Sequence, residues 1–101
     1  SVHASAHWRC GSIELDTRLA RVTVNGNPLT LTSHEYKVLA VLMQHQGEVV
    51  SRTDLVEHIY AQDSDRDSNT IDVFIGRLRK KLPPACIETA RGLGYRLVDV
   101  A

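Results

Sequence analysis

The sequence has few of the residues that build disulfide frameworks, metal centres or membrane spans. Only two of its 101 residues are cysteine, Cys10 and Cys86. No CxxC pair or Cys/His cluster accompanies them, so we expect two free thiols and no zinc site. No apolar run approaches the ~20 residues that a membrane span requires. No secretory leader opens the chain, and we interpret residues 1–7 as a linker remnant, with an ordered first strand as the alternative.

The chain also has no net charge, because 12 basic residues balance 12 acidic ones. This balance argues against a uniformly basic nucleic-acid binder. The charges are nevertheless sorted along the chain: residues 1–65 carry a net charge of −3 and residues 66–101 a net charge of +3. The asymmetry is informative because it concentrates the cations in the last third of the chain.

Catalytic motifs are absent as well. His34-Glu35 begins a metalloprotease-like HE pair, but Val38 stands where the second histidine would be needed. The chain has no Gly-rich phosphate loop and no Ser/His/Asp elbow. We therefore expect no enzyme, no bound metal and no cofactor.

What is present is a succession of short strands followed by three helices. Between Trp8 and Leu31 apolar and polar residues alternate around Asn25-Gly26, a strong hairpin signal, which predicts an antiparallel sheet of three or four strands. Thr32 and Glu35 have the spacing of a capping box at the start of a first helix that ends near Gly47. The later helices are expected over residues 51–60 and 69–82, with Pro83-Pro84 ending the third.

The last element, residues 86–100, is predicted to be a β-hairpin. Its turn holds Gly92 and Gly94, which can adopt positive φ without steric cost. The whole plan is α+β in a single domain over residues 8–101, with an N-terminal sheet (8–31), a three-helix core (32–82) and the hairpin.

The third helix has two distinct faces. At 100° per residue, Ile71, Ile75, Leu78 and Leu82 fall within about 60° of one another and form a core stripe. The outward face carries cations with small apolar groups, and Asp72 is its only acid. Arginine can donate two hydrogen bonds to guanine, and a Val or Thr methyl group can contact the thymine methyl. The alternative is that the cations only favour the C-terminal end of the helix dipole.

The hairpin favours the DNA-binding interpretation. It follows the basic helix directly and adds Arg91 and Arg96. Three helices followed by a two-stranded wing is the order of a winged helix-turn-helix. An arginine at the wing tip suits a narrow minor groove, which concentrates negative potential.

Three stretches of the sequence resemble a known family. The strings "TIDVFIGRLRKKL" and "IETARGLGYRL" are similar to the C-terminal effector domain of OmpR/PhoB-type response regulators of bacterial two-component systems. "LTSHEYKVLAVLMQHQGEVVSRTDLVEHIY" resembles the first two helices of the same domain. The resemblance extends over roughly residues 13–98, and the sheet before the helices is the family's own addition to the winged helix.

The resemblance implies a set of DNA contacts. The expected base contacts in the major groove are Asn69, Thr70, Val73, Phe74 and Arg77. The expected backbone contacts are Arg52, Tyr60, Arg79, Lys80, Lys81, Thr89 and Tyr95. Arg79 and Lys80 stand where backbone contacts or supporting ion pairs are made. Arg91 is the expected minor-groove residue.

Two positions depart from the family pattern. Family members commonly have a polar or basic residue where Phe74 stands, so Phe74 either touches a thymine methyl group or leans into the edge of the core. Gly76 replaces a frequent basic residue and costs about 1 kcal/mol of helix stability relative to alanine.

The resemblance also implies partners. We expect double-stranded DNA with direct repeats, bound by a head-to-tail dimer of a domain that is monomeric in solution. A phosphorylated receiver domain would precede Ser1, and the protein would be cytoplasmic. The acidic loop 61–68 contacts RNA polymerase or is merely solvated. The alternative function is a winged-helix module for protein–protein contact.

Overall fold

The structure is a computed structural model and describes residues 7–59 and 69–99. Four strands come first: β1 (His7–Cys10), β2 (Ile13–Asp16), β3 (Arg21–Val24) and β4 (Asn27–Leu29). Three helices follow: α1 (Ser33–Gln44), α2 (Arg52–Ile59) and α3 (Asn69–Lys81). The wing consists of β5 (Ile87–Ala90) and β6 (Gly94–Leu97). The predicted α+β winged-helix plan is confirmed.

The four N-terminal strands form an antiparallel meander in the order β1-β2-β3-β4. Alternation places Ile13, Leu15 and Val22 in the core, while the opposite face of the sheet stays polar. Strand β1 begins at His7, one residue before the predicted start of the domain.

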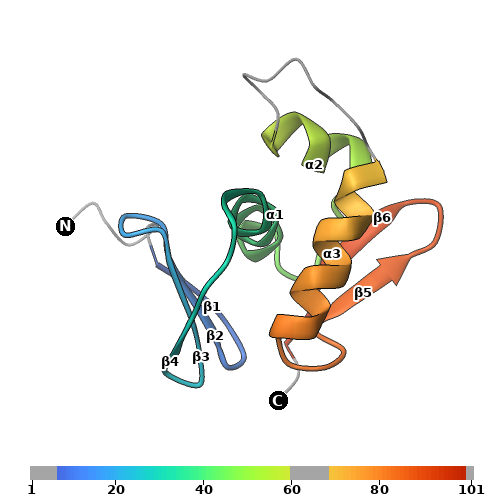
Figure 1. The fold of residues 1–101 in the computed structure, drawn as a ribbon. Helices are drawn as coiled ribbons and strands as arrows, with labels where there is room; N and C mark the ends of the chain where they lie inside the picture. Colours follow the sequence, from blue (N-terminus) through green and yellow to red (C-terminus); the bar gives the residue numbers. More distant parts are fainter. Residues whose placement is uncertain (1–6, 60–68, 100–101) are drawn as a thin grey trace.

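Helix α1 lies between this sheet and the rest of the domain (Figure 1). Its N-terminus has the predicted capping box: the Glu35 amide donates to Thr32 Oγ1 (3.3 Å) and the Thr32 amide donates to Glu35 Oε1 (3.1 Å). Ser51 caps α2 through a single hydrogen bond, because its Oγ accepts from the Asp54 amide at 3.0 Å. Both predicted helix starts are confirmed.

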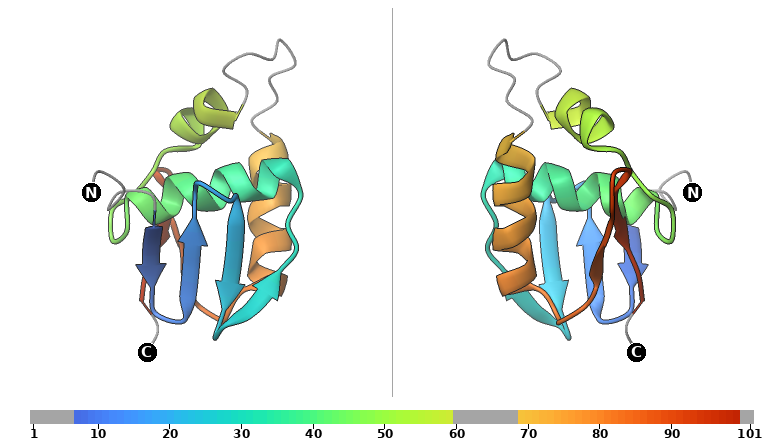
Figure 2. Two further views of the ribbon diagram at one scale, coloured as in Figure 1. Left: turned by 90° about the vertical axis from the view of Figure 1, so that its left-hand side faces the viewer. Right: turned by 90° about the vertical axis from the view of Figure 1, so that its right-hand side faces the viewer.

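Helix α3 runs along the side of α1 that faces away from the sheet, next to the wing (Figures 1 and 2). Its core stripe is as predicted: the residue exposures lie between 0% and 5% for Ile71, Ile75, Leu78 and Leu82. The remaining surface of α3 is therefore set by what α1, α2 and the wing leave uncovered.

The wing is anchored to the segment between α1 and α2. The Val50 amide donates to the Tyr95 carbonyl (2.8 Å), and the Tyr95 amide donates to the Val50 carbonyl (3.0 Å). Gly94 permits this approach, because a Cβ atom at that position would lie 2.0 Å from the Val50 carbonyl oxygen. The glycine that sequence analysis assigned to the turn is thus also required by packing.

Candidate nucleic-acid interface

The outward face of α3 presents Val73, Arg77 and Lys80. Val73 is 47% exposed, and both cations are exposed. Within residues 7–59 and 69–99, neither Arg77 nor Lys80 has a hydrogen-bonding or ion-pair partner. Both side chains are therefore available to a ligand at this face.

Phe74 does not belong to this face. Only 6% of the residue is exposed, and its ring centroid lies 5.3 Å from that of His34 on α1. Of the two alternatives, this burial favours the one in which Phe74 packs in the core over the one in which it contacts a base. The helix position lies between the core stripe and the outer face, and the N-terminal turn of α1 covers it.

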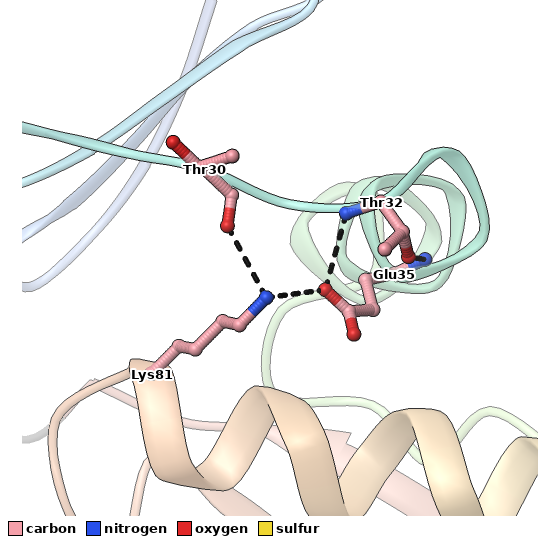
Figure 3. Close-up of polar contacts among 4 residues, drawn as sticks. All are labelled: Thr30, Thr32, Glu35 and Lys81. Carbon is pink, nitrogen blue, oxygen red and sulfur yellow. Dashed lines mark hydrogen bonds and ion pairs between the residues drawn. The ribbon is translucent and has the colours of Figure 1, made fainter.

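Lys81 turns toward the start of α1 instead of toward the outer face (Figure 3). Its Nζ donates to Glu35 Oε1 (2.8 Å) and to the Thr30 carbonyl (3.2 Å). These bonds favour a structural role for Lys81 over the predicted DNA-backbone contact, because the ammonium ties the C-terminal end of α3 to α1. Helical periodicity could not reveal this, since the partner Glu35 lies 46 residues earlier.

Glu35 is a buried carboxylate, with 1% of the residue exposed. Burial alone would raise its pKa. The hydrogen bonds from Lys81 and from the Thr32 amide, with the charges of Lys81 and Arg77, outweigh burial and lower the pKa of Glu35 below its ordinary value. Glu35 therefore stays ionised and holds Lys81 in place.

Arg79 connects α3 to the wing. Its Nη2 donates to the Ile87 carbonyl (3.1 Å) and to Thr89 Oγ1 (2.7 Å), and its guanidinium lies 5.9 Å from the centroid of the Tyr95 ring. Of the two roles weighed for Arg79, these contacts favour the supporting one. Thr89 is exposed and keeps its hydroxyl hydrogen for another acceptor.

Asp72 was not among the predicted site residues, although it stood out as the only acid on the outer face of α3. Its Oδ1 accepts a hydrogen bond from Arg52 Nη2 on α2 (3.0 Å) and another from the Tyr95 hydroxyl on β6. These bonds, that of Tyr95 first, lower the pKa of Asp72 below its ordinary value. One carboxylate oxygen thus joins α3, α2 and the wing.

This arrangement changes the role of Tyr95. The residue is 6% exposed, and its hydroxyl donates to Asp72. These contacts favour a structural role for the Tyr95 hydroxyl over the predicted phosphate contact. Arg52 remains half exposed beside its ion pair and can still be reached from solvent.

The side chains at the tip of the wing are exposed to solvent. The Leu93 amide donates to the Ala90 carbonyl (2.8 Å) and closes the turn, in which Gly92 has a φ of +72°. Arg91 is exposed, as is Leu93 (67%). A groove of about 290 Å³ separates the wing from the start of α2, lined by Ser51, Arg52, Thr53, Thr89, Ala90, Gly92, Leu93, Gly94 and Tyr95.

The remaining predicted contacts lie outside what the structure describes. Tyr60 and loop 61–68 are not described, and the backbones of Asn69 and Thr70 are helical without described side chains. The described part of the chain contains no group of histidine, cysteine and acidic side chains that could hold a metal ion. None of its helices could cross a membrane.

Comparison with known proteins agrees with this geometry. The family model "Transcriptional regulatory protein, C terminal" matches residues 26–97. The two-component response regulator PhoP of Pseudomonas aeruginosa is 42% identical over 94 residues, which cover 88% of this chain and 41% of PhoP. The transcriptional regulatory protein PrrA of Mycobacterium tuberculosis is 42% identical over 91 residues, covering 86% of this chain and 39% of PrrA. The chain thus spans about two fifths of the length of these relatives.

Solved structures show the same fold. The DNA-binding domain of CpxR from E. coli superposes with a TM-score of 0.82 at 31% identity, covering 94% of this chain and 98% of that one. The Klebsiella pneumoniae RstA DNA-binding domain, solved in complex with the RstA box, gives a TM-score of 0.77 at 27% identity, with 91% and 96% covered. The chain therefore belongs to the OmpR/PhoB-type family of response-regulator C-terminal domains, winged-helix domains that bind DNA and regulate transcription.

Proposed function

We propose that this domain is the sequence-specific DNA-binding output domain of a two-component response regulator, with α3 in the major groove and the wing tip at the minor groove. The observation that carries the proposal is the sorting of side chains on α3. Arg77 and Lys80 are exposed and unpaired within the described residues, while the neighbouring Arg79 and Lys81 are held by the protein itself.

In this arrangement Arg77 and Val73 read base edges. The guanidinium can donate two hydrogen bonds to guanine, and the valine methyl groups suit a thymine methyl group. Asn69 and Thr70, in the first turn of α3, are proposed to complete the base contacts.

The DNA backbone is proposed to follow two edges of this surface. Lys80 contacts one phosphate, and the groove between α2 and the wing admits another near Arg52 and Thr89. The amide groups at the start of α2 favour an anion there. Tyr60 stays in the proposal as a further phosphate contact. Arg91, exposed at the wing tip, reaches the minor groove, where narrow A·T-rich segments attract arginine.

The proposed partners extend beyond the chain. The matched response regulators are more than twice its length, which supports a receiver domain in the whole protein, acting in the cytoplasm. We further propose head-to-tail pairing of otherwise monomeric domains on direct repeats, and contact of loop 61–68 with RNA polymerase.

A duplex titration tests the proposal. Duplexes enriched by repeated selection from a random pool should bind more tightly than scrambled duplexes, and log K should fall linearly with log salt concentration. Binding without salt dependence, or no binding at any salt concentration, would instead favour a module for protein–protein contact. The number of shifted bands on one-repeat and two-repeat duplexes tests the pairing.

A further inference from the structure

We infer that Asp72 is a positioning residue for DNA binding. Its carboxylate fixes the wing and Arg52 relative to α3. Although Asp72 is negatively charged and lies on the side that faces DNA, it strengthens DNA binding because it holds these elements in place. The inference rests on the proposed function, because it assigns a role in that same interface to a residue that would not touch DNA.

The geometry joins three elements at one atom. Asp72 Oδ1 accepts from Arg52 Nη2 at 3.0 Å and also from the Tyr95 hydroxyl. Arg52 is the first residue of α2, Asp72 lies in the first turn of α3, and Tyr95 lies in β6. No other carboxylate in the described residues accepts hydrogen bonds from two different elements of the proposed interface.

The wing depends on this link for its orientation. Residues 87–97 reach the rest of the domain through the burial of Ile87 and Leu97 in the core and through four sets of hydrogen bonds. These are the Val50–Tyr95 backbone pair, the bond from the Gly47 amide to the Leu97 carbonyl (2.9 Å), and the bonds of the Arg79 side chain and the Tyr95 hydroxyl. Gly47 and Val50 both lie between α1 and α2, so these backbone hydrogen bonds do not join the wing to α3. The side chains of Arg79 and Asp72 make that connection, at the two ends of the helix.

If charge alone mattered, removing Asp72 would strengthen DNA binding instead of weakening it. The side chain is 48% exposed, so its charge would repel phosphates across the interface. Removal would also free Arg52 for DNA. A simple charge argument therefore expects tighter binding, whereas positioning expects weaker binding, because α2 and the wing must then be ordered when DNA binds.

The experiment compares Asp72→Ala with Glu57→Ala in full-domain protein on a selected duplex. Glu57 is exposed on α2 and has no partner among the described residues, so its removal changes the net charge equally. We expect Asp72→Ala to weaken binding about tenfold, the scale of one lost charge-assisted hydrogen bond, with an unchanged salt slope. Glu57→Ala should bind as the wild type does or slightly more tightly.

Tyr95→Phe provides an independent readout in a variant that keeps the ring packed. It should weaken binding, and adding it to Asp72→Ala should cause little further loss, because both remove the same link. Amide exchange at Tyr95 should accelerate in both variants while α1 exchange stays unchanged.

Three outcomes separate the possibilities. Asp72→Ala binding as tightly as the wild type overturns the inference, as does full additivity with Tyr95→Phe. A wild-type domain that binds no duplex refutes the proposed function itself.

Discussion

Lys81 Nζ lies 2.8 Å from Oε1 of the buried Glu35, which joins the C-terminal end of α3 to the first turn of α1. Lys81→Met leaves this carboxylate without its cation, and we expect a loss of about 3 kcal/mol in the free energy of unfolding, the lower end of the range for broken buried pairs. Urea denaturation measures the loss.

Lys80→Met is the matched control, because Lys80 is exposed and unpaired within the described residues. Its unfolding free energy should change by less than about 0.5 kcal/mol, while its affinity for DNA falls on all sequences alike. Equal stability of the two variants would contradict the structural role given to Lys81.

Acid should destabilise the domain through the same carboxylate. The pKa of Glu35 is lowered from an ordinary value of 4.5, and that of Asp72 from 3.8. A lowered folded-state pKa contributes stability that is complete above the ordinary value and is lost as pH falls through the folded-state pKa. Unfolding free energies measured from pH 6 to pH 2.5 should therefore decline below about pH 4.5, and Glu35→Gln should flatten that decline. An unchanged slope in Glu35→Gln would assign the acid sensitivity to other groups.

Gly94→Ala should destabilise the domain by about 2 kcal/mol or more, because the new Cβ atom would overlap the Val50 carbonyl and φ is +150°. Gly76→Ala provides the contrast: no atom lies within 4 Å of its added Cβ, and alanine favours the helix by about 1 kcal/mol. Thermal melts should shift in opposite directions. A tolerated Gly94→Ala would mean that the wing can leave Val50 without cost.

Arg77→Ala should cost roughly 1–3 kcal/mol of DNA-binding free energy and relax the preference at one or two base pairs. Competition between the selected duplex and single-base variants measures this preference. A loss that is equal on every sequence would make Arg77 a phosphate contact.

Arg91→Ala should weaken binding most on sites whose minor groove is narrow and rich in A·T pairs. Arg18→Ala removes a cation from the β2–β3 turn, outside the proposed interface, and should have little effect on any duplex. If Arg91→Ala shows no dependence on A·T content, the wing tip supplies only general attraction to the backbone.

The sequence predicted those features that depend on near neighbours. The core stripe of α3 follows from helical spacing, and the Thr32–Glu35 and Ser51–Asp54 caps follow from three-residue separations. The outward placement of Val73 and Arg77 follows from the same spacing. Because each of these signals is local, each could be found without coordinates.

The orientations of Lys81, Tyr95 and Phe74 depend on partners that are distant in the sequence. Lys81 and Val73 share an angular sector of the helix, but Glu35 and the Thr30 carbonyl draw Lys81 away from it. Tyr95 matched a phosphate contact by motif, yet its hydroxyl meets a carboxylate 23 residues earlier. The sequence leaves the position of Phe74 open between the core and the outer face, because a helical wheel does not show how far α1 covers this side chain.

Helix α3 has anchoring residues and outward residues, so substitutions that affect folding and substitutions that affect DNA recognition fall at different positions. Ile71, Ile75, Leu78 and Lys81 hold the helix, whereas Val73 and Arg77 contribute little to the packed interior. Substitutions at the outward positions are therefore nearly free of folding cost. A new operator preference could be engineered there, one or two side chains at a time, in a scaffold that keeps its stability.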